Sequence, residues 1–477
     1  MTATNVAATT AGSWGWRAIL PAIGLGLLGT ASALYAWARP VYMSILSAFM
    51  LRPYHIPFFD FEYLLTTATC WQHGVNVYLW NPCDELNRLM GYSPLWLRMR
   101  FLAIDHSWSA PLGLALAVLF CLSLAALVPT RRWRDQLAIG LVAFSPLTIY
   151  GVERGNIDLL VYLVALIAGF ALAGDFVVRV VGYGLLLGAG ILKFYPIVAL
   201  VVVVRERLAT FIAVAIVSAA ITLGFAAFYY QELLAALRNL PFDGYFWDSI
   251  GAKQLPGGIG YVLQPILARL GGTGWIPANS RILIAVVACL VIAMLLSIVI
   301  RIAISAEYRR QIAALPPRYA ALLQIGAALI IGCFFAGESV SYRAIMFLLA
   351  MPGLVLLDQP LVPRRLRLLV RCTTILIIVV MFRLAVIGVL TRFNLGPKSS
   401  ALAGLTWIGF ELAWWWIISV LAALLTCSIL ESTAWRELWT LLCEAGLMNR
   451  MKLPTRRSAE DTVPVLFRRN ESEEEGQ

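Results

Sequence analysis

Charged residues are scarce in this sequence. Only 13% of its 477 residues are Asp, Glu, Lys or Arg, whereas 61% are hydrophobic. This composition excludes an ordinary soluble domain and is typical of a chain with many membrane-spanning helices. The net charge of +11 does not indicate nucleic-acid binding, because the arginines fall mostly in short connectors between apolar runs, where they report orientation. We therefore expect membrane lipids as partners and no nucleic acid.

Metal-binding motifs are also missing. The three histidines have no metal-ligand spacing, and the sequence has no C-x-x-C motif. Most of the eight cysteines stand alone in apolar runs, but Cys70 and Cys83 lie together in the first long polar stretch. The residues between them include turn formers, so the chain can fold back on itself there. Either a disulfide or two free thiols fits this pattern, because the sequence does not give the distance between the two residues.

Apolar runs of about 20 residues predict an all-α polytopic membrane protein with about twelve spans. We interpret the first run as a span that is retained rather than a cleaved signal. The segments on either side of Lys193 are each too short for an upright span, so they predict two short helices that meet there. The clearest predicted spans are Ile19–Trp37, Leu112–Val128, Leu159–Ala173, Leu208–Phe228 and Leu405–Ile429.

The chain divides into three predicted regions. Residues 1–17 are an expected disordered cytoplasmic start, and 18–430 form the transmembrane domain. Residues 431–477 are a cytoplasmic tail, which begins as an amphipathic surface helix and ends in a charged disordered segment. Arg-rich connectors indicate the inner face, so the two large loops, 38–109 and 230–280, are expected outside. The first loop is expected to carry amphipathic helices on the membrane surface. A multi-pass protein of the inner (plasma) membrane, with its site facing the periplasm or exterior, fits this orientation.

The polar motifs all fall on the predicted outer face. A carboxylate beside paired cations suits an enzyme that binds a phosphate and deprotonates a hydroxyl. Each residue also has a structural alternative, such as a Glu153–Arg154 ion pair, an Arg343–Glu338 surface pair, or snorkelling of Lys193 to the interface. The candidate site residues are His55, Asp60, Glu62, Tyr92, Glu153, Arg154, Asn156, Asp158, Lys193, Tyr195, Glu338, Tyr342 and Arg343.

Several motifs recur in a fixed order between about residues 55 and 345. They are F-F-D-F-E-Y, then G-V-N-V-Y with N-P and Y-S-P-L-W, then G-N-I-D, K-F-Y-P and S-Y-R. In this order the sequence resembles the multi-spanning GT-C glycosyltransferases. The resemblance is closest to glycosyltransferase family 87, the polyprenyl-phosphate-mannose-dependent type.

The resemblance implies a GT-C-like fold and an inverting transfer of a sugar from a polyprenyl-phosphate donor to a glycan or glycolipid acceptor. Asp60 would be the general base, with Glu62 as its rival. Lys193 and Arg343 would hold the leaving phosphate. No cofactor or divalent metal is expected, because protein cations take the place of the metal. The residues that would shape the pocket are Glu153, Arg154 and Asn156.

Two other classes remain as alternatives. A lipid or sugar transporter, or a flippase, is expected to distribute charges through its spans and often to contain inverted repeats. Here the charges gather on one face, and no internal repeat is evident. An O-antigen polymerase or ligase would have a dominant Arg/His-rich outer loop late in the chain, whereas here an acidic loop comes first.

Overall fold

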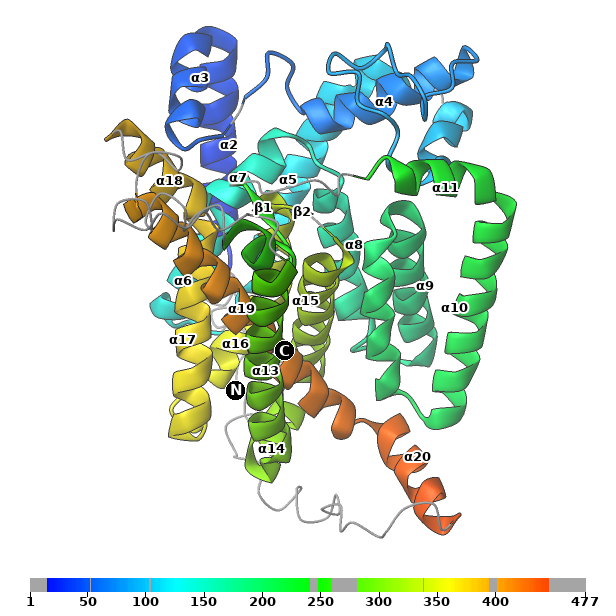
Figure 1. The fold of residues 1–477 in the computed structure, drawn as a ribbon, viewed down its shortest axis with the longest axis vertical. Coiled ribbons are helices and arrows are strands. Elements are labelled where there is room, and N and C mark those ends of the chain that lie inside the picture. The colour runs from blue at the N-terminus through cyan, green and yellow to red at the C-terminus, as the bar shows by residue number, and fades with distance from the viewer. Residues whose placement is uncertain are drawn as a thin grey trace, which may run out of the picture.

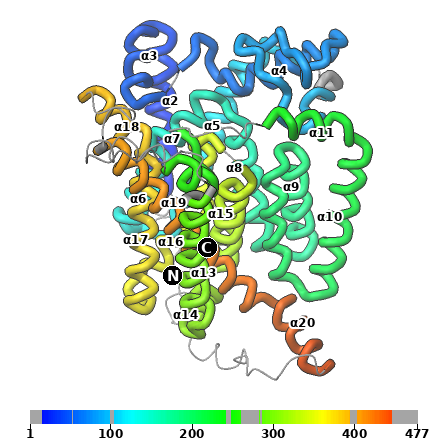
Figure 2. Tube along the Cα trace, viewed as in Figure 1, coloured from blue at the N-terminus to red at the C-terminus, as the bar shows by residue number. Residues whose placement is uncertain are grey.

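The computed structural model describes residues 15–51, 53–102, 104–240, 248–259, 281–337, 339–393 and 401–445. Apart from one pair of two-residue strands, the regular elements of these residues are helices, so the all-α architecture is confirmed. The long helices run side by side as a bundle (Figures 1 and 2). One end of the bundle, here called the α4 end, is covered by α3 (Arg39–Ala48), α4 (Phe59–Gln72) and α11 (Tyr230–Arg238).

Seven described helices are long and apolar enough to cross a membrane, or nine if two bent pairs each count as one span. The pairs are α6 (Trp133–Ala143) with α7 (Pro146–Glu153), bent by 49°, and α17 (Arg364–Met381) with α18 (Arg383–Arg392), bent by 50°. The protein is therefore a multi-pass membrane protein, while twelve spans remain a prediction. The seven are α2 (Ile19–Trp37), α5 (Ser109–Leu127), α9 (Phe176–Lys193), α10 (Leu208–Phe228), α13 (Arg281–Ile304), α15 (Pro317–Ala336) and α19 (Ala401–Leu430).

Three further apolar helical segments are shorter than a span. They are α8 (Asp158–Ala171), the 3₁₀-helix η3 (Tyr195–Arg205) and η4 (Ser341–Met346) continued by α16 (Phe347–Leu357). The expectation of two short helices meeting at Lys193 is wrong for the first of them, because α9 has 18 residues. Arginines are expected in connectors between apolar runs, and an arginine at position 179 therefore conceals the first turns of this helix. In the structure Arg179 lies inside α9 and pairs with Glu206 at 2.6 Å.

The centre of the bundle is the pair α15 and α16. Every residue of α16 is buried. Helices in a bilayer gain little from the hydrophobic effect when they associate, so close packing between small residues matters more. A Cβ at Gly326 of α15 would lie 2.7 Å from the backbone nitrogen of Ala350 on α16. Glycine at this position is therefore what allows the two backbones to approach each other.

A buried ion pair between α18 and α19 holds the two short strands in place. Nη1 of Arg383 lies 3.0 Å from Oε1 of Glu411, and both side chains are inaccessible to solvent. The same Nη1 donates a 3.0 Å hydrogen bond to the carbonyl oxygen of Ser249. Ser249 begins strand β1 (Ser249–Ile250), which pairs antiparallel with β2 (Ser339–Val340). Helices α18 and α19 thereby hold the segment that leads into η4.

The opposite end of the bundle carries α14 (Ala306–Ala313) and α20 (Thr433–Glu444) (Figure 1). Helix α20 coincides with the amphipathic helix expected in the tail. A carboxylate oxygen of Glu437 accepts a 2.7 Å hydrogen bond from the backbone N–H of Leu208 and so caps α10. Of the expected disordered start, residues 1–17, only 15–17 belong to the described part of the chain, and the expected disordered end lies outside it.

Cysteines introduced at Ser107 and Arg310 should react from opposite sides of the membrane. Both positions are exposed. Ser107 lies in the 3₁₀-helix η2 (His106–Trp108), which packs against α4, whereas Arg310 lies in α14 at the opposite end of the bundle. The distribution of arginines predicts Arg310 inside. A membrane-impermeant maleimide should label S107C in intact cells and R310C only after permeabilisation, with the unsubstituted protein as the control for its own cysteines. Labelling of both positions from one side would contradict this arrangement.

Candidate active site

The start of α4 docks on the turn between α7 and α8. The backbone N–H groups of Phe58 and Asp60 donate to the carbonyl oxygens of Glu153 (3.2 Å) and Arg154 (2.9 Å). Phe58 adopts a left-handed conformation with φ of 56°, and Gly155 opposite it has φ of 57°. A Cβ at Gly155 would lie 2.7 Å from Cβ of Phe58. The close approach fixes the first turn of α4 on the E-R-G-N-I-D motif.

Asp60 is buried among donors. Its Oδ1 accepts a 2.9 Å hydrogen bond from Nη1 of Arg88 and lies 3.8 Å from Nε of Arg154. Its Oδ2 accepts a 2.8 Å hydrogen bond from the amide of Asn156. Each carboxylate oxygen can accept about two hydrogen bonds, so both oxygens keep capacity for a substrate hydroxyl.

A second cluster of polar and charged side chains surrounds Asp158. Its Oδ1 accepts hydrogen bonds from Tyr195 (2.6 Å) and lies 2.9 Å from Nζ of Lys193, while its Oδ2 lies 3.5 Å from Nε of Arg343. Lys193 also donates to Oδ1 of Asn156 at 3.0 Å. Asn156 therefore connects the two groups, because its amide nitrogen serves Asp60 and its oxygen serves Lys193.

Two arginines of the site have buried N–H groups without an acceptor. They are Nε and Nη1 of Arg154 and Nε of Arg343. The Arg154 guanidinium lies 4.7 Å from the centroid of the Tyr54 ring, and Nη1 of Arg343 donates to Ser339 at 2.5 Å. An unsatisfied buried donor costs about 1–3 kcal/mol. A bound anion with several oxygens would remove that cost and form strong charge-assisted bonds.

Two tyrosines complete the candidate site. Nζ of Lys193 lies 5.2 Å from the ring centroid of Tyr92. Burial raises the pKa of Tyr92 above its ordinary value, so its phenol stays protonated at neutral pH. Tyr342 is buried and its ring packs edge-on against Tyr150, with the centroids 5.6 Å apart. Aromatic rings therefore lie next to the charged side chains of the site.

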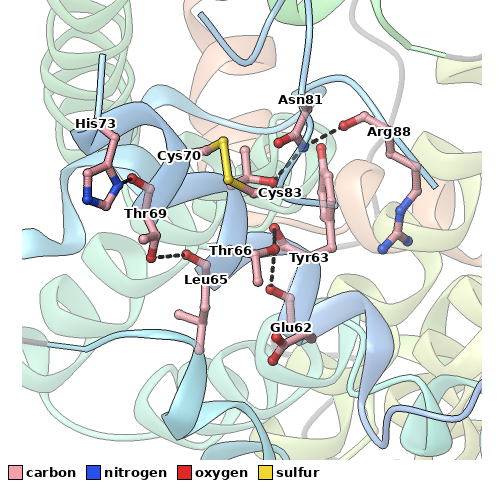
Figure 3. The surroundings of a disulfide bond; sticks show 11 residues. Glu62, Tyr63, Leu65, Thr66, Thr69, Cys70, His73, Asn81, Cys83 and Arg88 are labelled. Carbon is pink, nitrogen blue, oxygen red and sulfur yellow. Dashed lines mark hydrogen bonds between the residues drawn. A yellow bond between two sulfur atoms is a disulfide. The ribbon is translucent and has the colours of Figure 1, made fainter. Parts of the chain in front are cut away.

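Other predicted residues are not assembled in this way. His55 is exposed and its ring lies 2.9 Å from a carboxylate oxygen of Glu85. Among the described residues, nothing forms a hydrogen bond or ion pair with the Glu62 carboxylate, which points away from the disulfide in Figure 3. Glu153 has a buried carboxylate oxygen without a hydrogen-bond partner among the described residues, and it forms no ion pair with Arg154. Glu338 lies outside the described residues.

Arg88 belongs to the site but is not among the residues predicted from the sequence. Its guanidinium binds Asp84 at 2.8 Å as well as Asp60. Burial alone would lower the pKa of Arg88, but the hydrogen bonds that Arg88 donates to Asp84 and the charges of Asp60 and Asp84 outweigh burial and raise it. The four-residue spacing of Asp84 and Arg88 would indicate an ion pair if both residues lay on a helix, but they lie in a loop. No such signal exists for the contact with Asp60, which joins residues 28 positions apart.

The structure joins Cys70 and Cys83 in a disulfide, with their Cα atoms 6.0 Å apart (Figure 3). The sequence left open whether these cysteines form a disulfide or remain free thiols, and the structure contains the disulfide. Asn81 supports the same loop, because its amide donates to the hydroxyl of Thr67 (2.9 Å) and to the carbonyl oxygen of Arg88 (2.7 Å). The loop that carries Arg88 is thus fixed to α4 by covalent and hydrogen bonds.

No family model, curated protein or solved structure matches this chain. The resemblance to family 87 therefore remains a prediction from the motifs. Within the described part of the chain, no cluster of three His, Cys, Asp or Glu residues could hold a metal ion.

Replacing Gly155 by alanine should destabilise the protein. A Cβ there would collide with Phe58 and would also be held at positive φ, which together should cost about 1–3 kcal/mol. Gly188 of α9 is a matched control, because a Cβ there meets nothing within 4 Å. Thermal unfolding of the purified variants should show a loss for G155A and no loss for G188A. An unchanged G155A protein would contradict the docking of α4 described here.

Proposed function

We propose that this protein is an inverting glycosyltransferase that moves a sugar, such as mannose, from a polyprenyl-phosphate donor to a lipid-linked or envelope glycan. The observation that carries this proposal is the position of the Asp60 carboxylate beside Arg154, together with the acceptor-free N–H groups of Arg154 and Arg343. A transfer from a phosphate to a hydroxyl requires an acceptor for a proton and donors for a leaving phosphate.

The leaving phosphate binds Arg343 and Lys193, with Arg154 as a third cation. The Nε of Arg343 has no hydrogen-bond acceptor, and Lys193 uses only two of its three N–H donors on Asn156 and Asp158. Negative charge grows on the leaving phosphate in the transition state. Fixed cations in a site with little water stabilise that charge more strongly than water does.

Asp60 is the proposed base. The acceptor oxygen attacks the anomeric carbon of the donor sugar, and the bond from that carbon to the phosphate oxygen breaks. The polyprenyl phosphate leaves with the bonding electron pair, and the hydroxyl proton passes to the Asp60 carboxylate. Attack opposite the leaving group inverts the anomeric carbon. The hydrogen bonds from Arg88 and Asn156 hold the carboxylate in one orientation for this step.

The direct test uses purified protein in lipid vesicles with a panel of polyprenyl-phosphate sugars and a mixture of glycolipid acceptors. Release of polyprenyl phosphate that depends on an acceptor supports the proposal. Movement of the intact donor across the vesicle membrane without release supports a transporter instead. Transfer from a lipid diphosphate alone supports the polymerase or ligase class.

Asp60→Asn should reduce transfer by about a hundred- to ten-thousand-fold, because the amide fills the same space but accepts no proton. Glu62→Gln is the matched control, since Glu62 lies on the same helix and its carboxylate has no partner among the described residues. Turnover and donor binding should be measured for both variants. If D60N keeps its turnover and E62Q loses it, Glu62 is the base.

Arg343→Ala should weaken binding of polyprenyl phosphate by about ten- to a hundredfold, because a charge-assisted hydrogen bond contributes about 1.5–3 kcal/mol. Arg343→Lys should restore only part of the affinity, since lysine lacks the planar fork. Arg310→Ala, at the other end of the bundle, should have no effect. Equilibrium binding of polyprenyl phosphate checks all three, and normal binding by R343A would remove this residue from the donor site.

A further inference from the structure

We infer that Arg88 is a positioning residue for the Asp60 carboxylate and that the disulfide loop, residues 70–88, holds it in place. This inference rests on the proposed function, in which Asp60 takes the proton from the acceptor. The contact between Arg88 and Asp60 is a 2.9 Å hydrogen bond that Nη1 of Arg88 donates to Oδ1 of Asp60.

All three guanidinium nitrogens of Arg88 donate hydrogen bonds. Its guanidinium carbon lies 4.3 Å from the ring centroid of Phe59 and 4.4 Å from that of Tyr63. Its Nε and Nη2 donate to Asp84 (3.1 and 2.8 Å), and Nη2 also lies 3.3 Å from the carbonyl oxygen of Phe59. The remaining nitrogen, Nη1, is directed at Asp60. A planar fork is needed for this arrangement, and lysine does not provide one.

The backbone around Arg88 is fixed as well. Oδ2 of Asp84 accepts the backbone N–H groups of Leu86 (3.2 Å) and Arg88 (2.8 Å). Asn87 between them is left-handed, with φ of 52°. The Cys70–Cys83 bridge ends one residue before Asp84. A sparsely populated backbone conformation persists only where the surroundings determine it, and such positions cluster at functional sites.

Two consequences follow for Asp60. The hydrogen bond from Nη1 of Arg88 holds the carboxylate in one orientation. Because Arg88 already donates a hydrogen bond to Oδ1, this oxygen can accept fewer further hydrogen bonds, which restricts the direction from which the acceptor hydroxyl approaches. Other titratable groups that act electrostatically on or near Asp60 are Tyr63, Asp84, Tyr92, Tyr150, Glu153, Arg154, Asp158, Lys193, Tyr342 and Arg343.

The test is the pH dependence of transfer by the full-length protein and two Arg88 variants. Arg88→Gln should lower kcat about ten- to a hundredfold with little change in KM for the donor, because the carboxylate loses its alignment. It should also move the acid limb of the pH profile to higher pH, because a nearby cation is lost. Arg88→Lys should restore the acid limb but not kcat, which separates charge from orientation.

Arg98→Gln is the matched control. Arg98 lies in the 3₁₀-helix η1 (Pro94–Leu102), which packs against α4, and it is half exposed and pairs with Glu232 at 3.2 Å. This variant should leave kcat and the acid limb unchanged. If R88Q behaves like R98Q, the inference is overturned.

A second variant covers the case in which R88Q does not fold. The double variant C70S/C83S keeps Arg88 but releases its loop, so it should lower kcat and shift the acid limb in the same direction by a smaller amount. A normal kcat and acid limb in a folded double variant would overturn the role of the disulfide loop.

One readout does not depend on activity. Infrared difference spectra of wild-type protein against D60N report the titration of the Asp60 carboxylate. The same difference taken in the R88Q background (or the C70S/C83S background) should titrate at higher pH. If the wild-type protein transfers no sugar but this shift is present, the proposed function fails while the link between Arg88 and Asp60 stands. An absent shift overturns the link.

Discussion

The site depends on one amide. Asn156 donates from its nitrogen to Asp60 and accepts with its oxygen from Lys193, so it joins an acidic partner to a basic one. No charged side chain can do both, because a carboxylate only accepts and an ammonium only donates. Its oxygen also accepts the backbone N–H of Asp158 and fixes the start of α8. The proposed base and the proposed phosphate ligands are therefore oriented through the same side chain.

The charges of the site are placed where helix ends stabilise them. Asp60 and Asp158 lie in the first turns of α4 and α8, and Lys193 is the last residue of α9. The helix macrodipole favours carboxylates at N-termini and cations at C-termini, each by about 0.3–1 kcal/mol. The effect is small beside the cost of burying a charge, which only pairing can offset. Pairing is what the structure provides, since each of these three groups has at least one partner of opposite charge within 3 Å.

The sequence predicted those parts of the molecule that depend on local pattern. The bounds of α2 and α10 coincide with the predicted spans, because uninterrupted apolar runs between polar residues define both ends. The motifs around Asp60, Asn156, Lys193 and Arg343 do lie together. The sequence pattern does not show which side chains pair with each charged residue. Lys193 was predicted to hold a phosphate, and in the structure it also binds Asn156 and Asp158. The contacts of Arg88 depend on how its loop folds back on α4.

Backbone strain marks the same residues. Four described non-glycine residues have positive φ, and three of them adjoin a charged group of the site: Phe58 precedes Asp60 by two positions, Asn87 precedes Arg88, and Phe194 follows Lys193. Such conformations cost of order 1–3 kcal/mol each and persist where surrounding contacts determine them. At Phe194 the benefit is visible. The turn ends α9 and starts η3, so Lys193 and Tyr195, one on each side of the break, both reach the same oxygen of Asp158. A continuous helix would place residues two apart on different faces, and only one of them could reach that oxygen.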